Sequence, residues 1–182
     1  MAKDSIVQFV GYITQLNQEV FEPDWEQYSQ TLANKKTDLF LLEQTDESKN
    51  KFRYISKHIW PEADFNHSMV YEKPSRFFPE HSVKIVQTGG YFPLQSKKRQ
   101  KEETDCKLVA FLSHDENDLE YYQQLAGKNH VEVHQAYYES CSYGYVLEFS
   151  VSERDADELL QALKKHTSVE AGIYRECLVP HI

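Results

Sequence analysis

Two stretches in separate halves of the chain share one pattern, and this repeat constrains the fold more than any other feature. The first is KFRYISKHIWPEADF at 51–65, and the second is SYGYVLEFSVSERDADEL at 142–159. Each begins with the β-branched and aromatic residues that favour a strand, and each continues into a stretch whose apolar residues have helical spacing. The chain is therefore expected to contain two copies of one structural unit.

Around each stretch, the apolar and turn patterns predict the element order βαββαβ. Strands are predicted at 6–13, 38–44, 52–60 and 83–89 in the first copy, and at 107–112, 130–139, 143–151 and 169–177 in the second. Pro23 and Pro61 suit the first turns of two helices, and Asn117 and Ser152 suit the N-caps of two more. Gly127 is expected to end the third helix.

The segment between the two copies is polar and charged, and it has no apolar periodicity. We therefore interpret 95–105 as a charged linker between a first unit at 1–94 and a second unit at 106–182. The loop at 71–81 carries Phe77 and Phe78, which either close the end of the core or form a lid.

Aligning the copies separates the two faces of the third strand in each unit. Phe52, Tyr54, Ser56 and His58 match Tyr143, Tyr145, Leu147 and Phe149, whereas Arg53, Ile55 and Lys57 match Gly144, Val146 and Glu148. An antiparallel sheet with both helices on one side leaves its other face open. Because the first set is rich in aromatic residues, we expect these faces to pack against each other. The prediction is an α+β protein of two tandem ferredoxin-like units, with its antiparallel sheets packed as a pseudo-dimeric α/β barrel.

This layout resembles the dimeric α/β-barrel superfamily, in which ferredoxin-like units pair through their sheets. It looks most like a tandem, single-chain version of the antibiotic-biosynthesis-monooxygenase type of module. The resemblance extends over nearly the whole chain and rests on element order and aromatic pattern. Cofactor-free oxygenases, haem-degrading enzymes, haem peroxidases, small lyases and plain ligand binders share the fold, so the fold alone leaves the function open.

The aromatic faces predict a site for a small apolar or aromatic molecule between the sheets. A cofactor-independent, monooxygenase-like enzyme would use Tyr54 and His58 as catalytic residues for proton transfer, with Trp60, Tyr145 and Phe149 binding the ligand. An imidazole beside a phenol also suits haem iron, so the cofactor stays unknown. The alternative is a non-catalytic structural or protein-interaction module whose aromatic side chains fill the barrel. Whether the chain is an enzyme stays open.

No metal site is predicted. His130 and His134 lie roughly 13 Å apart on an extended strand, so they cannot bind one ion together. Glu132 and His134 share a face, but two ligands without a third make a poor zinc site. His114 lies in a turn before acidic residues and is expected to be solvated.

The remaining motifs have structural interpretations. Cys106, Cys141 and Cys177 form no CxxC pair and are expected to be structural or incidental, with Cys141 in an exposed turn. Gly89 and Gly90 lack the surroundings of a phosphate-binding loop, and they favour a strand end or a bulge.

Charge patterning argues against a nucleic-acid partner. Residues 1–104 hold 14 basic and 15 acidic residues, residues 105–182 hold 6 and 14, and the total charge is −9. Tyr143-Gly144-Tyr145-Val146 matches the middle of the RNA-recognition-motif signature, but Cys141 stands where a basic residue is expected and Glu148 replaces the last aromatic. This acidic half is expected to repel phosphate backbones.

The short apolar runs and the N-terminal sequence predict neither a membrane span nor a signal peptide. With three cysteines and no paired motif, we expect a cytoplasmic protein. It is expected to be a monomer that forms its own pseudo-dimer, or a homodimer, with a small molecule as its possible ligand.

Overall fold

The computed structural model describes residues 5–13, 38–45, 50–61, 84–97, 106–139, 141–166 and 169–177. These ranges hold eight strands and two helices: β1 (Ser5–Ile13), β2 (Asp38–Gln44), β3 (Phe52–Pro61), β4 (Lys84–Lys97), β5 (Cys106–Leu112), α3 (Leu119–Ala126), β6 (His130–Ala136), β7 (Tyr145–Val151), α4 (Glu153–Lys164) and β8 (Glu170–Cys177). Neither described helix is long and apolar enough to cross a bilayer.

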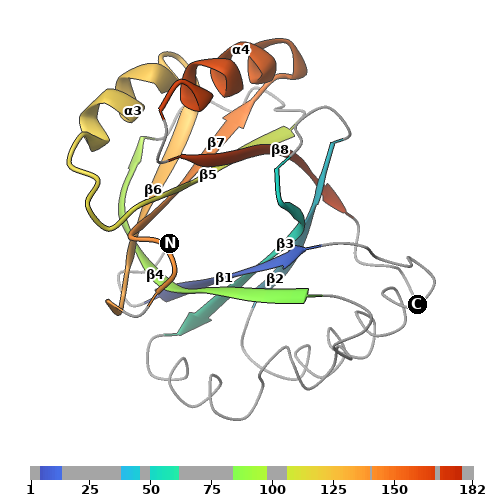
Figure 1. The fold of residues 1–182 in the computed structure, drawn as a ribbon, viewed down its shortest axis with the longest axis vertical. Coiled ribbons are helices and arrows are strands. Elements are labelled where there is room, and N and C mark those ends of the chain that lie inside the picture. Colours follow the sequence, from blue (N-terminus) through green and yellow to red (C-terminus); the bar gives the residue numbers. More distant parts are fainter. Residues whose placement is uncertain are drawn as a thin grey trace.

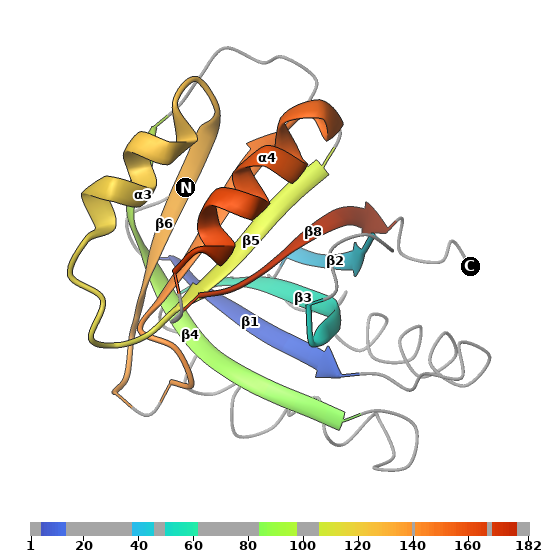
Figure 2. The same cartoon turned by 45° about the horizontal axis from the view of Figure 1, so that its top comes forward.

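The eight strands form one closed antiparallel barrel with the order β1-β3-β2-β8-β5-β7-β6-β4. Strands from the first half of the chain lie side by side, as do those from the second half, and the two sets join through the β2–β8 and β4–β6 pairs. Figure 1 shows the two sets facing each other, and Figure 2 shows the twist of the strands. The expected barrel and the mostly-sheet α+β class are confirmed. The pairing of two ferredoxin-like units stays a prediction, because 14–37 and 62–83 lie outside the described residues.

Strand β4 departs from the expectation that Gly89 ends it. The strand continues to Lys97, into the segment interpreted as a linker, and pairs with both β1 and β6. Its register against β1 shifts between Phe9 and Val10, and Gly89 has φ +118° at this shift. Gly89 therefore lies at a bulge within the strand and not at its end. A bulge was one of the two interpretations of the glycine pair.

Both described helices cover the outer face of the second sheet, as Figures 1 and 2 show. The cap predicted for α4 is confirmed, because the Ser152 hydroxyl accepts a hydrogen bond from the Asp155 N–H at 3.3 Å. The cap predicted for α3 is wrong by one residue: Asp118 occupies that position and makes no side-chain cap bond. Gly127, with φ +54°, closes α3 as expected.

The described apolar residues pack on both sides of the barrel wall. Leu147 and Phe149 of β7 belong to a core between the second sheet and its two helices, together with Leu160 and Leu163 of α4. A second core fills the barrel interior and includes Val146 of the same strand. The strands of this sheet are therefore buried on both faces, so neither face could be recognised by exposure to water.

The loop at 71–81, with its two phenylalanines, and the first two predicted helices lie outside the described residues.

Candidate functional site

Alternation along β3 and β7 decides which side chains face the barrel interior. Ile55 of β3 and Val146 of β7 belong to the interior core. Lys57, two residues beyond Ile55, forms an ion pair with Glu148, two residues beyond Val146, with Nζ 2.7 Å from Oε2. Because β3 and β7 lie on opposite walls in the closed strand order, this contact crosses the interior.

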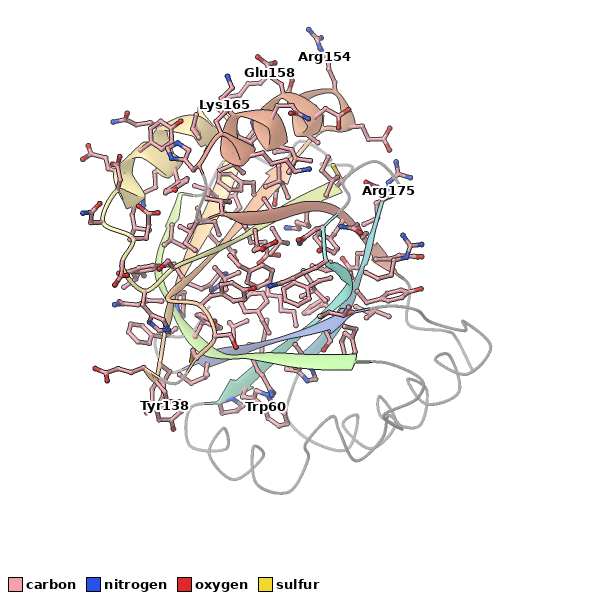
Figure 3. All side chains as sticks on the ribbon, in the orientation of Figure 1. Trp60, Tyr138, Arg154, Glu158, Lys165 and Arg175 are labelled. Atoms are coloured by element: carbon pink, nitrogen blue, oxygen red, sulfur yellow. The ribbon has the colours of Figure 1, made fainter. Side chains whose placement is uncertain are left out.

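The residues predicted to line the site lie on the other faces of these strands. Tyr54, His58 and Trp60 lie on the outer face of the first sheet, and Figure 3 shows Trp60 on the side of that sheet away from α4. Phe149 belongs to the core under the helices, and Tyr145 packs against it. The expectation that these five residues meet between the sheets is therefore wrong, because the barrel walls separate the two groups.

The physical reason for this error is the burial of both faces, which removes the polar-apolar alternation that marks a half-exposed sheet. The five predicted residues face the helices or the outer side of the first sheet. Lys57 and Glu148 point inward instead, into a core that holds other aromatic residues, among them Phe9 and Phe52. The catalytic roles of Tyr54 and His58 and the ligand-binding roles of Trp60, Tyr145 and Phe149 stay predictions.

Tyr54 and His58 are four residues apart on β3, roughly 13 Å along an extended strand, and His58 belongs to a buried chain of hydrogen bonds. Its Nε2 lies 2.9 Å from the Ser56 hydroxyl, which shares a 2.8 Å hydrogen bond with the Tyr12 hydroxyl. The Trp60 ring stacks parallel to the imidazole, with centroids 6.3 Å apart. Burial lowers the pKa of His58 to about 3 and raises the pKa of Tyr12 above its usual range. The His58 imidazole is therefore neutral, and its Nε2 atom is already hydrogen-bonded to Ser56.

The interior contains a group of ionisable side chains that sequence reasoning missed. We call it the interior charged cluster, and its members come from β3, β5, β6 and β7: Lys57, Lys107, Glu132, His134 and Glu148.

Glu148 is the centre of the interior charged cluster. Beside the short contact with Lys57, its carboxylate lies 3.8 Å from Lys107 Nζ and 3.6 Å from His134 Nε2. Glu132 of β6 lies opposite Glu148 of β7 in the strand register. The Oε2 atom of Glu132 lies 3.5 Å from His134 Nε2 and 3.9 Å from Lys57 Nζ. Each carboxylate of the cluster therefore has at least two basic neighbours.

These contacts set the charge states in the cluster. Burial raises the pKa of Glu148, but Lys57 and the other basic groups outweigh it and hold that pKa far below its usual range. The contact with His134 lowers the pKa of Glu132 to about 2. Burial lowers the pKa values of His134 and Lys57, but the neighbouring carboxylates outweigh burial and raise both. Both carboxylates are therefore ionised at neutral pH.

Aromatic side chains of the interior core lie beside the cluster, and Phe9 joins them to it. Phe9 packs edge-on against His134 at 5.3 Å and against Tyr91 at 5.7 Å, and Phe111 packs against Phe52 at 5.3 Å. Toward solvent the cluster is less enclosed, because the side chains of Lys107 and Glu132 are 34% and 26% exposed. The cluster is therefore accessible from one side and anchored in a packed interior on the other.

Glu132, His134 and Glu148 each offer one ligand atom, and these atoms lie within 4.8 Å of one another. The third ligand that the sequence lacked thus comes from the neighbouring strand. Two signals pointed to it: Glu148 interrupts an otherwise apolar strand, and it matches Lys57 in the internal repeat. Assigning it to the site required the register of β6 against β7.

The cysteines and His114 have structural contacts. Cys106 and Cys141 are both buried. The exposure expected for Cys141 is wrong, since its thiol lies 3.5 Å from the Gly90 carbonyl. His114 Nε2 lies 2.7 Å from the Cys141 carbonyl oxygen, so this imidazole stabilises the turn that contains Cys141. The side chain of Cys177 lies outside the described residues.

A groove of about 510 Å³ lies outside the barrel wall, at the first turn of α4 and beside β8. It is lined by Thr45, Cys106, Glu153, Arg154, Ala156, Asp157, Ile173 and Arg175. Figure 3 shows Arg154 and Arg175 near this end of the molecule. The charges in this groove alternate in sign, and Arg175 pairs with Glu153, so the groove has no single electrostatic preference.

No protein-family model and no curated protein matches the sequence. Solved structures do match in fold. A mutant chlorite dismutase from Candidatus Nitrospira defluvii in complex with cyanide aligns with a TM-score of 0.64 at 8% identity, over 98% of this chain and 93% of that one. An anthrone oxidase-like protein aligns with a TM-score of 0.60 at 8% identity, over 97% and 93%. These proteins belong to the dimeric α/β-barrel superfamily, and the chain is similar to them in fold.

Proposed function

We propose that this protein is an enzyme that acts on a small, oxygen-bearing aromatic or apolar molecule at the interior charged cluster. The observation that carries this proposal is the placement of Glu148, only 3% exposed, among two lysines and a buried histidine inside the barrel. Burying charges in this way is a poor means of gaining stability, since apolar residues of similar volume often serve as well or better. Concentrated ionisable groups with shifted pKa values are typical of functional sites.

The geometry suggests how a substrate would lie. Lys107 and Glu132, the more exposed members of the cluster, face the side from which a molecule would approach. A carbonyl, hydroxyl or carboxylate oxygen would be held by the Lys107 ammonium, while the apolar body would rest against the barrel mouth. The buried carboxylates and imidazole are groups able to polarise the substrate. Solved structures of similar fold include proteins described as a dismutase and as oxidase-like, so this scaffold supports enzymes elsewhere.

A non-catalytic role remains the second candidate, and the tight aromatic packing of the interior favours it. In that role the cluster would only join the two walls, and the filled barrel would serve as a rigid module for protein interactions. The two candidates differ in whether a small molecule binds at the cluster.

The test is a small-molecule binding screen of the full chain, with native mass spectrometry as the readout. We expect oxygen-bearing aromatic compounds to bind, and we expect Lys107→Met to weaken the best of them at least about tenfold, as the loss of a charged hydrogen bond does. Lys51→Met, which removes a surface lysine of similar exposure, is the matched control and should leave binding unchanged. If no compound binds, or if both variants bind like wild type, the enzymatic proposal is wrong at this cluster.

A further inference from the structure

We propose that Glu132, His134 and Glu148 bind a divalent transition-metal ion in the barrel. This inference goes beyond the proposed function and shares its location, but metal binding can be measured without any substrate. The two carboxylates and the imidazole come from adjacent strands, with Glu132 directly opposite Glu148 in the β6–β7 ladder. Their ligand atoms lie within 4.8 Å of one another.

The separations of the imidazole nitrogen from the two carboxylate oxygens suit a tetrahedral ion. His134 Nε2 lies 3.5 Å from Glu132 Oε2 and 3.6 Å from Glu148 Oε2. Ligands bound to zinc at about 2.0–2.2 Å in tetrahedral geometry are roughly 3.3–3.6 Å apart. The same separations are too long for good N–H···O hydrogen bonds, which have a mode of about 2.9–3.0 Å. His134 Nε2 is thus spaced from each carboxylate oxygen as two ligands of one ion are, and all three ligand atoms lie within 4.8 Å of one another.

The state of His134 is the second, independent observation. Its side chain is fully buried, and among the described residues neither ring nitrogen has a hydrogen-bond partner. A buried nitrogen without a partner is costly, so most such groups in native proteins are satisfied by protein, water or an ion. Because Nε2 points between two carboxylate oxygens, a metal ion placed there would satisfy it.

Lys57 shows that this position already attracts positive charge. Its Nζ lies 2.7 Å from Glu148 Oε2 and 3.9 Å from Glu132 Oε2, the same two oxygens that face His134. A divalent ion would replace the Lys57 ammonium as the positive charge beside these two carboxylates, and the lysine side chain would move away from them inside the barrel. The lysine therefore competes with the metal, and its removal should strengthen metal binding.

The chemistry of the ligands indicates the class of ion. One imidazole and two carboxylates suit zinc, manganese, iron or cobalt and exclude a preference for soft ions such as Cu(I). Three protein ligands leave a coordination position for water or a substrate oxygen. Metal-assisted chemistry would then replace the cofactor-independent oxygenase chemistry expected from the sequence.

The experiment is a titration of tag-free, chelator-treated full chain with Zn²⁺ by calorimetry and with Co²⁺ by visible absorption. We expect one ion per chain and a Co²⁺ spectrum of tetrahedral nitrogen and oxygen ligation. His134→Gln and Glu148→Gln should each weaken binding by at least about tenfold, given that even outer-shell changes cost 10–100-fold. His166→Asn, which alters a histidine outside the cluster, should bind like wild type.

Lys57→Met keeps the test decisive if a ligand variant fails to fold. In this variant we expect tighter binding than in wild type and a larger rise in melting temperature on adding Zn²⁺. Absence of stoichiometric binding to the wild type, or binding that Lys57→Met does not strengthen, would overturn the inference. If metal binding fails while Lys107-dependent small-molecule binding persists, only the metal inference falls. If the metal binds and no small molecule does, the proposed enzyme function falls instead.

Discussion

Individual residues show most clearly where sequence reasoning succeeded and where it stopped. Lys57 and Glu148 occupy matched positions of the internal repeat, and that match could be made from the sequence alone. Their contact could not, because a charged residue in a strand is usually exposed to water, and here two of them meet inside the barrel. The match between Lys57 and Glu148 was therefore visible in the sequence, but the site was predicted on the aromatic face of the strands instead.

His58 gives a pH dependence of stability at the residue scale. Its pKa is lowered to about 3 in the folded protein, from 6.5 when unfolded. Below pH 6.5 the His58 imidazole is therefore protonated in the unfolded chain but stays neutral in the folded chain. The effect of His58 on the free energy of unfolding is therefore zero above pH 6.5. Between pH 6.5 and pH 3 it lowers that free energy by up to about 1.4 kcal/mol for each pH unit.

Urea unfolding of wild type and His58→Gln between pH 7 and pH 4 measures this contribution. We expect the wild type to lose more unfolding free energy over this range than the variant does. Parallel pH profiles for the two proteins would show that the imidazole is not buried in a neutral state.

Gly89 gives a second test at this scale. Its φ of +118° is one that other residues rarely adopt, and a Cβ there would collide with the Cys141 side chain. Gly89→Ala should lower the free energy of unfolding by about 1–3 kcal/mol from backbone strain, with the collision adding to this. Gly127→Ala is the control, because its φ is also positive but a Cβ there would meet no other described part of the chain within 4 Å, so about 1 kcal/mol is expected. Equal losses in thermal or urea unfolding would contradict the bulge geometry.

At the scale of elements, the sequence predicted the existence of strands better than their ends. All eight strands lie where the apolar runs placed them, because β-branched and aromatic runs bounded by turn residues are a local signal. The end of β4 was missed since a glycine pair followed by Pro93 is typical of a strand terminus, whereas here β6 supplies a partner beyond it. Pairing with a distant strand is not encoded locally, and it overrode the turn signal.

The two described helices differ in their N-caps, and this predicts different responses to substitution. Ser152→Ala removes the cap bond to the Asp155 N–H and should cost about 1 kcal/mol. Asp118→Ala removes a side chain that makes no cap bond at α3, so its effect should be a few tenths of a kcal/mol at most. Urea unfolding of both variants checks this order, and a larger loss for Asp118→Ala would contradict the cap assignments.

At the scale of the whole molecule, the barrel was predicted correctly from the sequence pattern, but the face of each strand that points inward was not. In an open sheet, water on one side produces an alternation that reveals the buried face. In this barrel, the helices cover Phe149 and the barrel interior encloses Glu148, so two residues adjacent in sequence are both shielded from water. Only contacts between opposite walls resolve this ambiguity, and Lys57 with Glu148 is such a contact.

The most direct test of the interior assignment is a double-mutant cycle in which Lys57→Met and Glu148→Gln are combined, with unfolding free energies measured in chelator. The geometry predicts a coupling energy of about 2–3 kcal/mol, because each single variant removes the shortest ion pair of a charge that is shielded from water. The exposed Lys51–Glu170 pair is the reference cycle, for which less than about 1 kcal/mol is expected. A coupling between Lys57 and Glu148 below about 0.5 kcal/mol would mean that the two residues do not meet, and the interior site would have to be abandoned.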